Sequence, residues 1–511
     1  MIRRNHRFEV QWLIIPIFAA VLVWAIYTAA LGWNNGMALH NFRQTQTAIT
    51  SYYMVRGGPF LKYETPVLGY PWSVPFEFPL YQWIAAKASI WFHLPLESAG
   101  RATSEFFYAL SLFAIWGILS ELHIRRIHRL VFLIMILVSP QYIYWSRTFM
   151  IESTAFFFSA AYLYWILRYV RTRRILDAGC GAICGALGAL VKVTTFPAFA
   201  LVGGLYLAFT LRRDGWNQWN RFRNVVITGL MLFGIPLFIG WGWTSFSDQV
   251  KTHNVITNGH LTSAALVTWN FGTIQQRFLL STWQRMYSQT ITELTGNPLL
   301  LLLPCVALFA FARHRVPFFL ISIAGFLSVF LIFTNVHVIH DHYAYANGAF
   351  LLAAVSWCIV GLLEGAVWKQ ILAVALLVIS ITSATVAYSG RLYQYQQFTG
   401  KNWGLLIPAI QKSTSPSDVI VIFANDWSPE LPYYSERRAL MWAPWMQQDV
   451  NTPDFKEAVA NLGNNQIGAA VFCHPPQKLL EDALPALNLA PEISVQEGPC
   501  ELHLRRNASQ K

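Results

Sequence analysis

Long apolar stretches separated by short polar turns make up most of the first 390 residues. A bilayer core about 30 Å thick needs a helix of roughly 20 apolar residues. The hydrophobic pattern offers about eleven such stretches, which are typical of a multi-pass membrane protein. We predict spans at 10–32, 101–121, 129–144, 152–168, 175–194, 196–211, 224–245, 298–312, 316–334, 344–363 and 370–388.

Composition agrees with this prediction. Of the 511 residues, 55% are hydrophobic and only 12% are charged, and the mean hydropathy is +0.39, which excludes an ordinary soluble protein. The net charge of +12 is placed at alternate turns between the spans, as expected for cytoplasmic loops rather than for a nucleic-acid surface. These turns contain Arg3, Arg4, Arg7, Arg125, Arg126, Arg129, Arg168, Arg171, Arg173, Arg174, Arg212, Arg213, Arg221, Arg223, Arg313, Arg315 and Lys369.

The charge pattern places the N-terminus in the cytoplasm and the tail after Gly390 on the opposite side of the membrane. The first apolar run is longer than the core of a signal peptide, so we expect a retained helix. Two further outer segments are long, 33–100 and 246–297. We expect an interfacial helix at Leu80–Leu94 and an amphipathic helix at Gln275–Leu294.

The tail has the pattern of a small α/β domain. Asp418–Ala424 and Ala469–Phe472 are predicted strands, and Pro453–Leu462 and Gln477–Leu487 are predicted helices. Cys473 and Cys500 both lie in this exported tail, where a disulfide is chemically possible, although their spacing alone does not decide it. Trp-rich connections at 427–432 and 442–445 would either stack on sugar rings or pack against the membrane domain.

Candidate chemistry begins in the first outer segment, where Glu64 and Glu77 are the carboxylates of a polar and aromatic stretch at 41–83. Removing a proton from a hydroxyl group needs a positioned carboxylate or imidazole, and aromatic neighbours favour that role. The alternative is that each carboxylate only forms an ion pair with Arg43, Arg56 or Lys62.

Two other basic side chains stand at predicted outer helix ends. Arg147 precedes Glu152, whose place in a first helical turn is explained by the helix dipole alone. Lys192 ends the fifth span, where it would either reach toward the interface or balance a phosphate charge.

The segment 335–347 reads NVHVIHDHYAYAN and is rich in histidine. A divalent metal is one possibility, but the spacing fits no standard zinc pattern. We favour His340, His342 and Tyr343 as hydrogen-bond donors to an anionic headgroup, and assign no metal ligands.

The order of these motifs resembles the bacterial GT-C glycosyltransferases, the relatives of protein O-mannosyltransferases and aminoarabinose transferases that use a polyprenyl-phosphate sugar. FRQTQT at 42–47 is similar to the family's WRQADT motif, and EFPLYQW at 77–83 resembles KPPLYYW. SRTFMIE at 146–152 looks like the second-loop motif, and HDHY at 340–343 resembles HDYY. The resemblance covers about residues 10–390.

The resemblance implies inversion at the anomeric carbon, an outer-loop carboxylate as base and basic residues on the lipid phosphate. The family's usual aspartate aligns with Gln46, which cannot accept a proton, so Glu77, or else Glu64, takes the role of base. The motifs then assign the donor or acceptor to Arg43, Gln44, Gln46, Arg147, Glu152, Lys192, His340, Asp341, His342 and Tyr343.

We therefore expect an all-α polytopic membrane domain of the GT-C type at 1–390, with interfacial helices in its first outer loop, and a periplasmic α/β domain at 391–511. The expected function is transfer of a sugar from a polyprenyl-phosphate donor to a periplasmic glycan, lipid or protein at the bacterial inner membrane. A lipid-linked glycan flippase would need ionisable groups at mid-depth in the spans, which are rare here. A non-catalytic glycan-binding scaffold is the third alternative, because of Gln46.

Overall fold

A computed structural model describes residues 10–214, 226–399, 403–424, 426–446, 449–463 and 466–506. The basic residues Arg3, Arg4, Arg7, Arg221 and Arg223, part of the predicted topology signal, lie outside these ranges. The chain divides into two compact units, which we describe separately. The helical unit comprises 1–33, 101–241 and 267–397, and the mixed unit comprises 34–100, 242–266 and 398–511.

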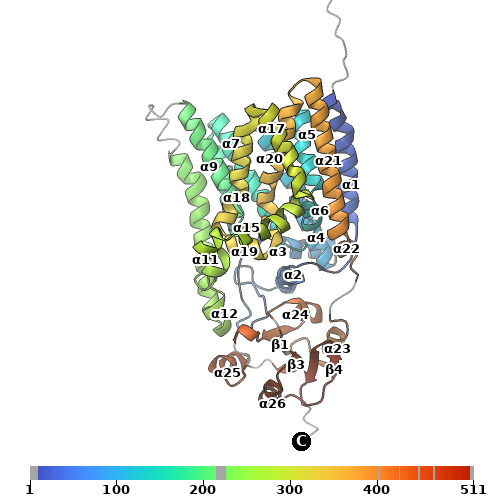
Figure 1. Cartoon of the computed structure of the whole chain (residues 1–511). Helices are drawn as coiled ribbons and strands as arrows, with labels where there is room; N and C mark the ends of the chain where they lie inside the picture. The colour runs from blue at the N-terminus through green and yellow to red at the C-terminus, as the bar shows by residue number, and fades with distance from the viewer. Residues whose placement is uncertain are drawn as a thin grey trace, which may run out of the picture. The chain divides into compact units, whose positions relative to one another are not determined.

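Long apolar helices dominate the helical unit, and they run side by side (Figure 1). Within the described part of the chain, six segments are long and apolar enough to cross a membrane: Val10–Ala30, Leu96–Glu121, Val226–Lys251, Arg313–Ile332, Asp341–Leu363 and Val367–Arg391. Each of the eleven predicted spans overlaps a helix, and several of these helices extend beyond the predicted bounds. The overlapping helices are α1 (Ile14–Ala30), α4 (Leu96–Glu121), α5 (Arg126–Val138), α7 (Glu152–Thr172), α8 (Ile175–Val191), α9 (Phe196–Asp214), α11 (Ile235–Lys251), α17 (Leu302–Phe311), α18 (Val316–Ile332), α20 (Tyr345–Leu363) and α21 (Val367–Arg391).

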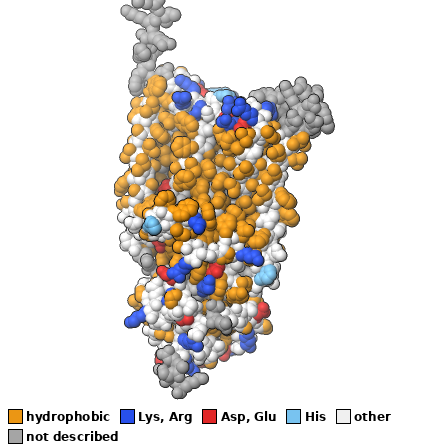
Figure 2. All heavy atoms as spheres, turned by 180° about the vertical axis from the view of Figure 1, so that it is seen from behind, with side chains coloured by type: hydrophobic (Ala, Val, Ile, Leu, Met, Phe, Trp, Pro, Cys, Tyr) orange, Lys and Arg blue, Asp and Glu red, His pale blue; other side chains and the backbone are white. Residues whose placement is uncertain are grey.

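Burial separates these helices into a centre and a periphery. Helix α20 packs against α5, α17, α18 and α21, and 89% of its apolar window is buried inside the protein. In the apolar windows that contain α1 and α21, only 17% and 28% of the residues are buried, and Figure 2 shows hydrophobic side chains covering this unit's visible side. Exposed apolar helix surface without polar gaps is what a lipid environment accommodates.

Ion pairs join helix ends that the charge pattern assigns to one membrane face. Arg171 at the end of α7 bonds Glu121 at the end of α4, at 2.5 Å. Glu364, which follows α20, contacts Arg315 and, at 2.7 Å, His314. Figure 2 shows Lys and Arg side chains gathered at one end of the helices. Glu121 and Glu364 are therefore partners of basic side chains at these helix ends. The direction of the helices across a membrane stays a prediction.

The predicted amphipathic helix at Gln275–Leu294 is wrong as a single element. Leu279 adopts an extended backbone conformation, with φ −75° and ψ 124°, and separates two short helices. The stretch consists of α14 (Ile274–Phe278), α15 (Leu280–Met286), the π-helical η3 (Tyr287–Ile291) and α16 (Thr292–Thr295). Other short elements of the unit are η1 (Val10–Leu13), α6 (Pro140–Trp145), η2 (Leu230–Gly234), α13 (Val267–Phe271), η4 (Pro298–Leu301), η5 (Arg313–Arg315), α19 (Thr334–Ile339), η6 (Asp341–Ala344) and α22 (Tyr393–Gln396).

The tail folds into the predicted α/β arrangement. A five-stranded sheet has the order β2 (Arg438–Met441), β1 (Val419–Phe423), β3 (Ile467–Cys473), β5 (Cys500–Leu504) and β4 (Val495–Glu497). Strands β2, β1 and β3 pair in parallel, and β5 runs antiparallel to both of its neighbours, β3 and β4. The disulfide between Cys473 and Cys500 joins β3 to β5. The elements are α23 (Leu406–Ser413), β1 (Val419–Phe423), α24 (Glu430–Ser435), β2 (Arg438–Met441), η7 (Pro444–Met446), α25 (Pro453–Ala460), β3 (Ile467–Cys473), α26 (Gln477–Ala486), β4 (Val495–Glu497) and β5 (Cys500–Leu504).

The first outer loop packs with this tail in the mixed unit. It contributes α2 (Asn41–Val55) and α3 (Leu80–Phe92), the latter at the predicted interfacial stretch, and α12 (Val255–His260) joins them. The 66–69 segment bonds the backbone of edge strand β2, with Ala439 N donating to Pro66 O and Met441 N to Val67 O, both at 2.9 Å. A covered edge cannot pair with another chain.

Candidate active site

A cluster of polar side chains forms around Glu77 in the mixed unit, and we call Arg43, Gln46, Glu77 and Gln82 the carboxylate cluster. The Arg43 guanidinium donates to Gln46 Oε1 at 2.6 Å and to Glu77 Oε1 at 2.9 Å. Gln82 Nε2 donates to the same Glu77 oxygen at 2.9 Å. One guanidinium thus brings Glu77 next to the residue that aligns with the family's aspartate, although the two lie 31 positions apart.

Three anchors fix the backbone of Glu77. The Tyr63 hydroxyl accepts a hydrogen bond from Phe76 N at 2.7 Å and donates to Glu77 O at 3.0 Å. Burial raises the pKa of Tyr63 well above its usual value, so the hydroxyl keeps the proton that it donates. Trp243 Nε1 donates to Phe76 O at 3.0 Å, and Ser247 Oγ donates to Pro75 O at 2.5 Å. Glu77 therefore starts from a defined backbone position.

The other candidates in this segment have different partners. Gln44 Nε2 donates to Leu39 O at 2.7 Å, within its own chain segment. Glu64 forms an ion pair with Arg438 of strand β2 at 2.7 Å. Both carboxylates thus form ion pairs, as the alternative prediction expected. Glu77 pairs with Arg43, and Glu64 pairs with Arg438 of the tail instead of Arg43, Arg56 or Lys62.

A second cluster, the lysine cluster, forms in the helical unit from Glu152, Lys192, His342 and Tyr343. Lys192 Nζ lies 2.7 Å from Glu152 Oε1 and 4.0 Å from the centre of the Tyr343 ring. His342 Nε2 lies 3.9 Å from the same Glu152 oxygen. Lys192, Glu152 and His342 are nearly completely buried. The structure therefore gathers four of the residues that the sequence motifs singled out.

Close packing of two helices builds this cluster, because Glu152 begins α7 and Lys192 directly follows α8. A Cβ atom at Gly185 of α8 would lie 2.8 Å from Tyr162 Cδ2 of α7, and one at Gly188 would lie 3.1 Å from Ser159 Oγ. Small residues let apolar helices approach closely. The glycines of α8 thus bring its end against the start of α7.

Arg147 does not join the lysine cluster. Its guanidinium donates to Thr28 O, at 3.3 Å, and to Leu31 O, at the carboxyl end of α1. A cation at this position satisfies helix carbonyl groups that lack intrahelical donors. Glu152, five positions further on, is paired with Lys192.

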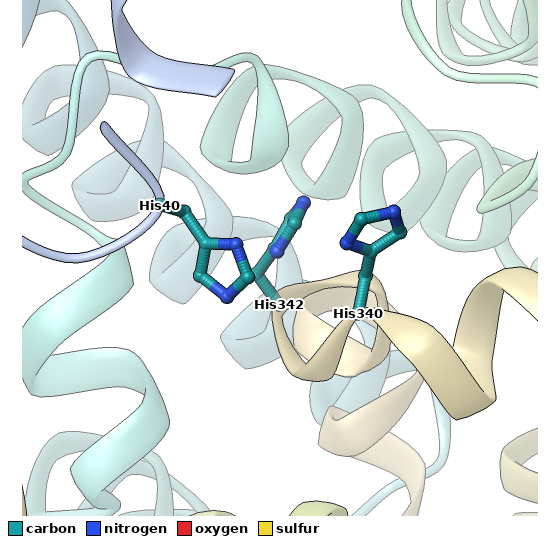
Figure 3. Close-up of side chains that lie close together, drawn as sticks. All are labelled: His40, His340 and His342. Atoms are coloured by element: carbon teal, nitrogen blue, oxygen red, sulfur yellow. The ribbon is translucent and has the colours of Figure 1, made fainter. Parts of the chain in front are cut away.

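His340 and His342 project from one stretch of chain, with ring centres 5.4 Å apart (Figure 3). Asp341 Oδ1 accepts a hydrogen bond from His342 N at 2.7 Å. Two imidazoles provide only half of the four ligands usual for a structural zinc ion, so we assign no metal from them.

Glu293 and Arg391 were missed at the sequence level. Glu293 of α16 is 4% exposed, and Arg391 Nη2 lies 3.6 Å from its Oε1 atom. Burial, followed by the charge of Asp341, raises the pKa of Glu293 to about 8. Gln82 was also missed as a partner of Glu77. For Gln82 the available signal was that it interrupts the apolar stretch at 80–94, whereas Glu293 lies in a stretch, 286–297, that is already rich in polar residues.

Sequence comparison finds no matching protein-family model and no matching curated protein. Solved structures do match. ArnT from Cupriavidus metallidurans bound to undecaprenyl phosphate aligns with a TM-score of 0.62 over 97% of this chain and 98% of that chain, at 12% identity. The protein has the GT-C fold. The apo state of ArnT gives a TM-score of 0.57 over 96% and 97% of the two chains, also at 12% identity.

A second GT-C structure also matches. The archaeal oligosaccharyltransferase AglB from Archaeoglobus fulgidus, in complex with an inhibitory peptide and a dolichol-phosphate, gives a TM-score of 0.55 at 11% identity. This match covers 89% of this chain and 69% of AglB. Together with the six long apolar helices, these likenesses confirm the predicted GT-C fold and a multi-pass membrane protein.

Proposed function

We propose that this protein is an integral membrane glycosyltransferase that moves a sugar from a polyprenyl-phosphate donor to an acceptor hydroxyl, with inversion. The observation that supports the proposal is the structural similarity to ArnT bound to undecaprenyl phosphate, which extends over nearly the whole length of both chains. We place the protein in a bacterial inner membrane, with its N-terminus in the cytoplasm and its reaction on the periplasmic side, on the distribution of basic turns.

Glu77 is the proposed base. As the acceptor oxygen bonds the anomeric carbon, the acceptor proton passes to a Glu77 carboxylate oxygen, and the bond between that carbon and the phosphate oxygen breaks. Arg43 and Gln46 would hold the carboxylate and orient the sugar or the acceptor. Support comes from the single guanidinium that joins Gln46 to Glu77. Glu64 is the second candidate for the base.

The lysine cluster is the proposed phosphate site. A lipid phosphate leaves more easily when its charge is neutralised, and Lys192 provides a cation while His342 and Tyr343 provide hydrogen-bond donors. Glu152 would fix the Lys192 ammonium, and His340 and Asp341 would position His342. Gln44 is kept as a substrate-binding candidate. For Arg147, the bonds to backbone carbonyl groups favour a structural role over a phosphate contact.

The test is transfer by purified protein from a panel of polyprenyl-phosphate sugars, using Glu77→Gln, Glu64→Gln and the exposed α26 control Glu481→Gln. A general base contributes about 10²–10⁴-fold to the rate. We expect Glu77→Gln to lose turnover by that factor while donor binding and the thermal midpoint stay near wild type. A larger loss in Glu64→Gln would transfer the role of base to Glu64.

A catalytically inactive sugar-binding protein is the second candidate, favoured by Gln46 at the aspartate position and by the Arg43 partner of Glu77. If wild type binds a polyprenyl-phosphate sugar but transfers it to no acceptor in matched membrane extract, this second function replaces the first. Transfer by wild type would exclude it.

A further inference from the structure

A polar pocket of about 410 Å³ lies in the mixed unit, where the end of α2 meets the tail. Its volume falls within the range of about 300–1,000 Å³ that is usual for small-ligand sites. The lining combines two cations, one carboxylate, an aromatic ring and a glycine turn: Tyr53, Arg56, Gly57, Gly58, Pro59, Glu64, Pro416, Ser417 and Arg438. None of these residues belongs to the carboxylate or the lysine cluster.

Three side chains hold the Arg438 guanidinium at one side of the pocket. Its guanidinium stands 5.3 Å from the centre of the Tyr53 ring and 5.4 Å from that of Trp72, and its Nη2 bonds Glu64 at 2.7 Å. Its Nε is buried and has no hydrogen-bond partner among the described residues. A buried donor without an acceptor costs free energy.

The charges of the pocket are balanced. Arg438 is neutralised by Glu64, and Arg56 pairs with Glu436 at 3.1 Å. Glu436 lies outside the lining, but when it is counted, two arginines face two carboxylates. The pocket thus presents both donors and acceptors, and each of its cations already has an anionic partner. A neutral ligand with many hydroxyl groups matches this surface, since each hydroxyl both donates and accepts. The Tyr53 ring adds an apolar face for the carbon side of a sugar ring.

The pocket wall continues into the segment that carries Glu77. Glu64 forms a β-bridge with Ser73, and the neighbouring Tyr63 bonds the backbone at Phe76 and Glu77. A ligand held at Glu64 is therefore bound to the same short two-stranded loop that positions the candidate base.

We propose that this pocket binds a neutral sugar residue of the acceptor, which makes the acceptor a glycan. That the sugar belongs to the acceptor rests on the proposed glycosyltransferase function. The binding of a neutral sugar here does not depend on catalysis.

The test uses the full-length protein in lipid nanodiscs, with methyl α-D-glucopyranoside and methyl α-D-mannopyranoside as neutral probes and methyl glucuronide as a charged one. Ser417→Trp places an indole at the exposed pocket rim without altering the Arg and Glu residues. Ser494→Trp, at an exposed position beside β4, is the matched control. Binding is followed by saturation-transfer NMR, and folding by the thermal midpoint.

We expect at least one neutral glycoside to bind wild type and Ser494→Trp, and its Kd to rise about tenfold or more in Ser417→Trp, or 1.4 kcal/mol. No neutral binding, equal binding to both variants, or preference for methyl glucuronide would overturn the assignment. If Ser417→Trp does not fold, Arg438→Gln takes its place, with the same expected loss.

The polyprenyl-phosphate transfer assay separates the two proposals. Suppose that Ser417→Trp weakens probe binding but the wild-type protein transfers no sugar. This result supports the pocket as a sugar site and contradicts the proposed function. If both wild type and Ser417→Trp transfer sugar and have the same KM for the acceptor, the proposed function is supported and the pocket assignment is contradicted.

Discussion

The carboxylate cluster and the lysine cluster each contain one cation bonded to one glutamate at a similar distance, 2.9 Å for Arg43 and Glu77 and 2.7 Å for Lys192 and Glu152. Their burial differs. The first pair is 18% and 12% exposed, and the second is 8% and 2% exposed. A partly hydrated pair can exchange partners cheaply, whereas a buried pair that loses one member leaves an uncompensated charge.

Two ion pairs of similar length are therefore expected to have different roles. Arg43 bonds Gln46 as well as Glu77. If the Glu77 carboxylate leaves Arg43, the guanidinium therefore still has the Gln46 side chain as a hydrogen-bond partner. Lys192 and Glu152 hold two helix ends together and carry their charges into the protein interior. We therefore expect substitutions in the lysine cluster to change stability first, and those in the carboxylate cluster to change turnover first.

The largest expected effect is on folding. Lys192→Met removes the cation bonded to the buried Glu152 carboxylate and should lower the free energy of unfolding by about 3–5 kcal/mol. The double variant Lys192→Met/Glu152→Leu should recover most of this loss, since apolar pairs replace buried ion pairs well. Denaturation of the detergent-solubilised protein measures both, with the exposed Lys412→Met as control. A double variant as unstable as the single one would contradict the role of the buried charge.

The next effect is on turnover. Arg43→Lys keeps the charge but loses the planar fork that bonds Gln46 and Glu77 together. A misplaced reacting group can cost about 10²-fold, so we expect a fall of that order in kcat with the donor Kd unchanged. Transfer kinetics with Arg285→Lys, an exposed arginine of α15, provide the comparison. Wild-type turnover in Arg43→Lys would show that the shared guanidinium is not needed.

A smaller effect concerns the approach of α8 to α7. Alanine normally favours a helix over glycine by up to about 1 kcal/mol. At Gly185 the added Cβ would meet Tyr162 and Pro236 at 2.8 Å, and we expect a net loss of about 1–3 kcal/mol together with weaker polyprenyl-phosphate binding. Gly179 lies in the same helix with nothing within 4 Å of an added Cβ. Gly179→Ala should be neutral or stabilising, and equal effects at both positions would contradict the packing argument.

The last effect is a pH dependence at Glu293, whose pKa responds to burial and to the nearby charge of Asp341. The folded protein raises the pKa of Glu293 from 4.5 to about 8, so it binds a proton there that the unfolded chain releases. The resulting stabilisation is complete below pH 4.5 and is lost as the pH rises through about 8. Glu293→Gln cannot ionise and should flatten this decline in the thermal midpoint, whereas Glu481→Gln should not. An unchanged slope in Glu293→Gln would refute the assignment.

Part of the site was predictable because short motifs keep functional side chains at fixed spacing. The motif at 42–47 identified Arg43 and Gln46, and the segments at 146–152 and 340–343 identified Glu152, His342 and Tyr343. The partners were less predictable. Glu64 bonds Arg438, which lies 374 positions away, and no local pattern selects one arginine of the tail among several.

The helical membrane domain, the polar motifs and the strands at 418–424 and 469–472 could be predicted from the sequence alone, because span length and hydrophobic alternation are local properties. The two strands occur at 419–423 and 467–473. Tertiary structure decided three other features: the break at Leu279, the covering of edge strand β2 by 66–69, and the pairing of Lys192 with Glu152. Each depends on which distant backbone or charge comes within bonding distance. That distance is set by the packing of whole helices and sheets, which the sequence specifies only through the complete fold.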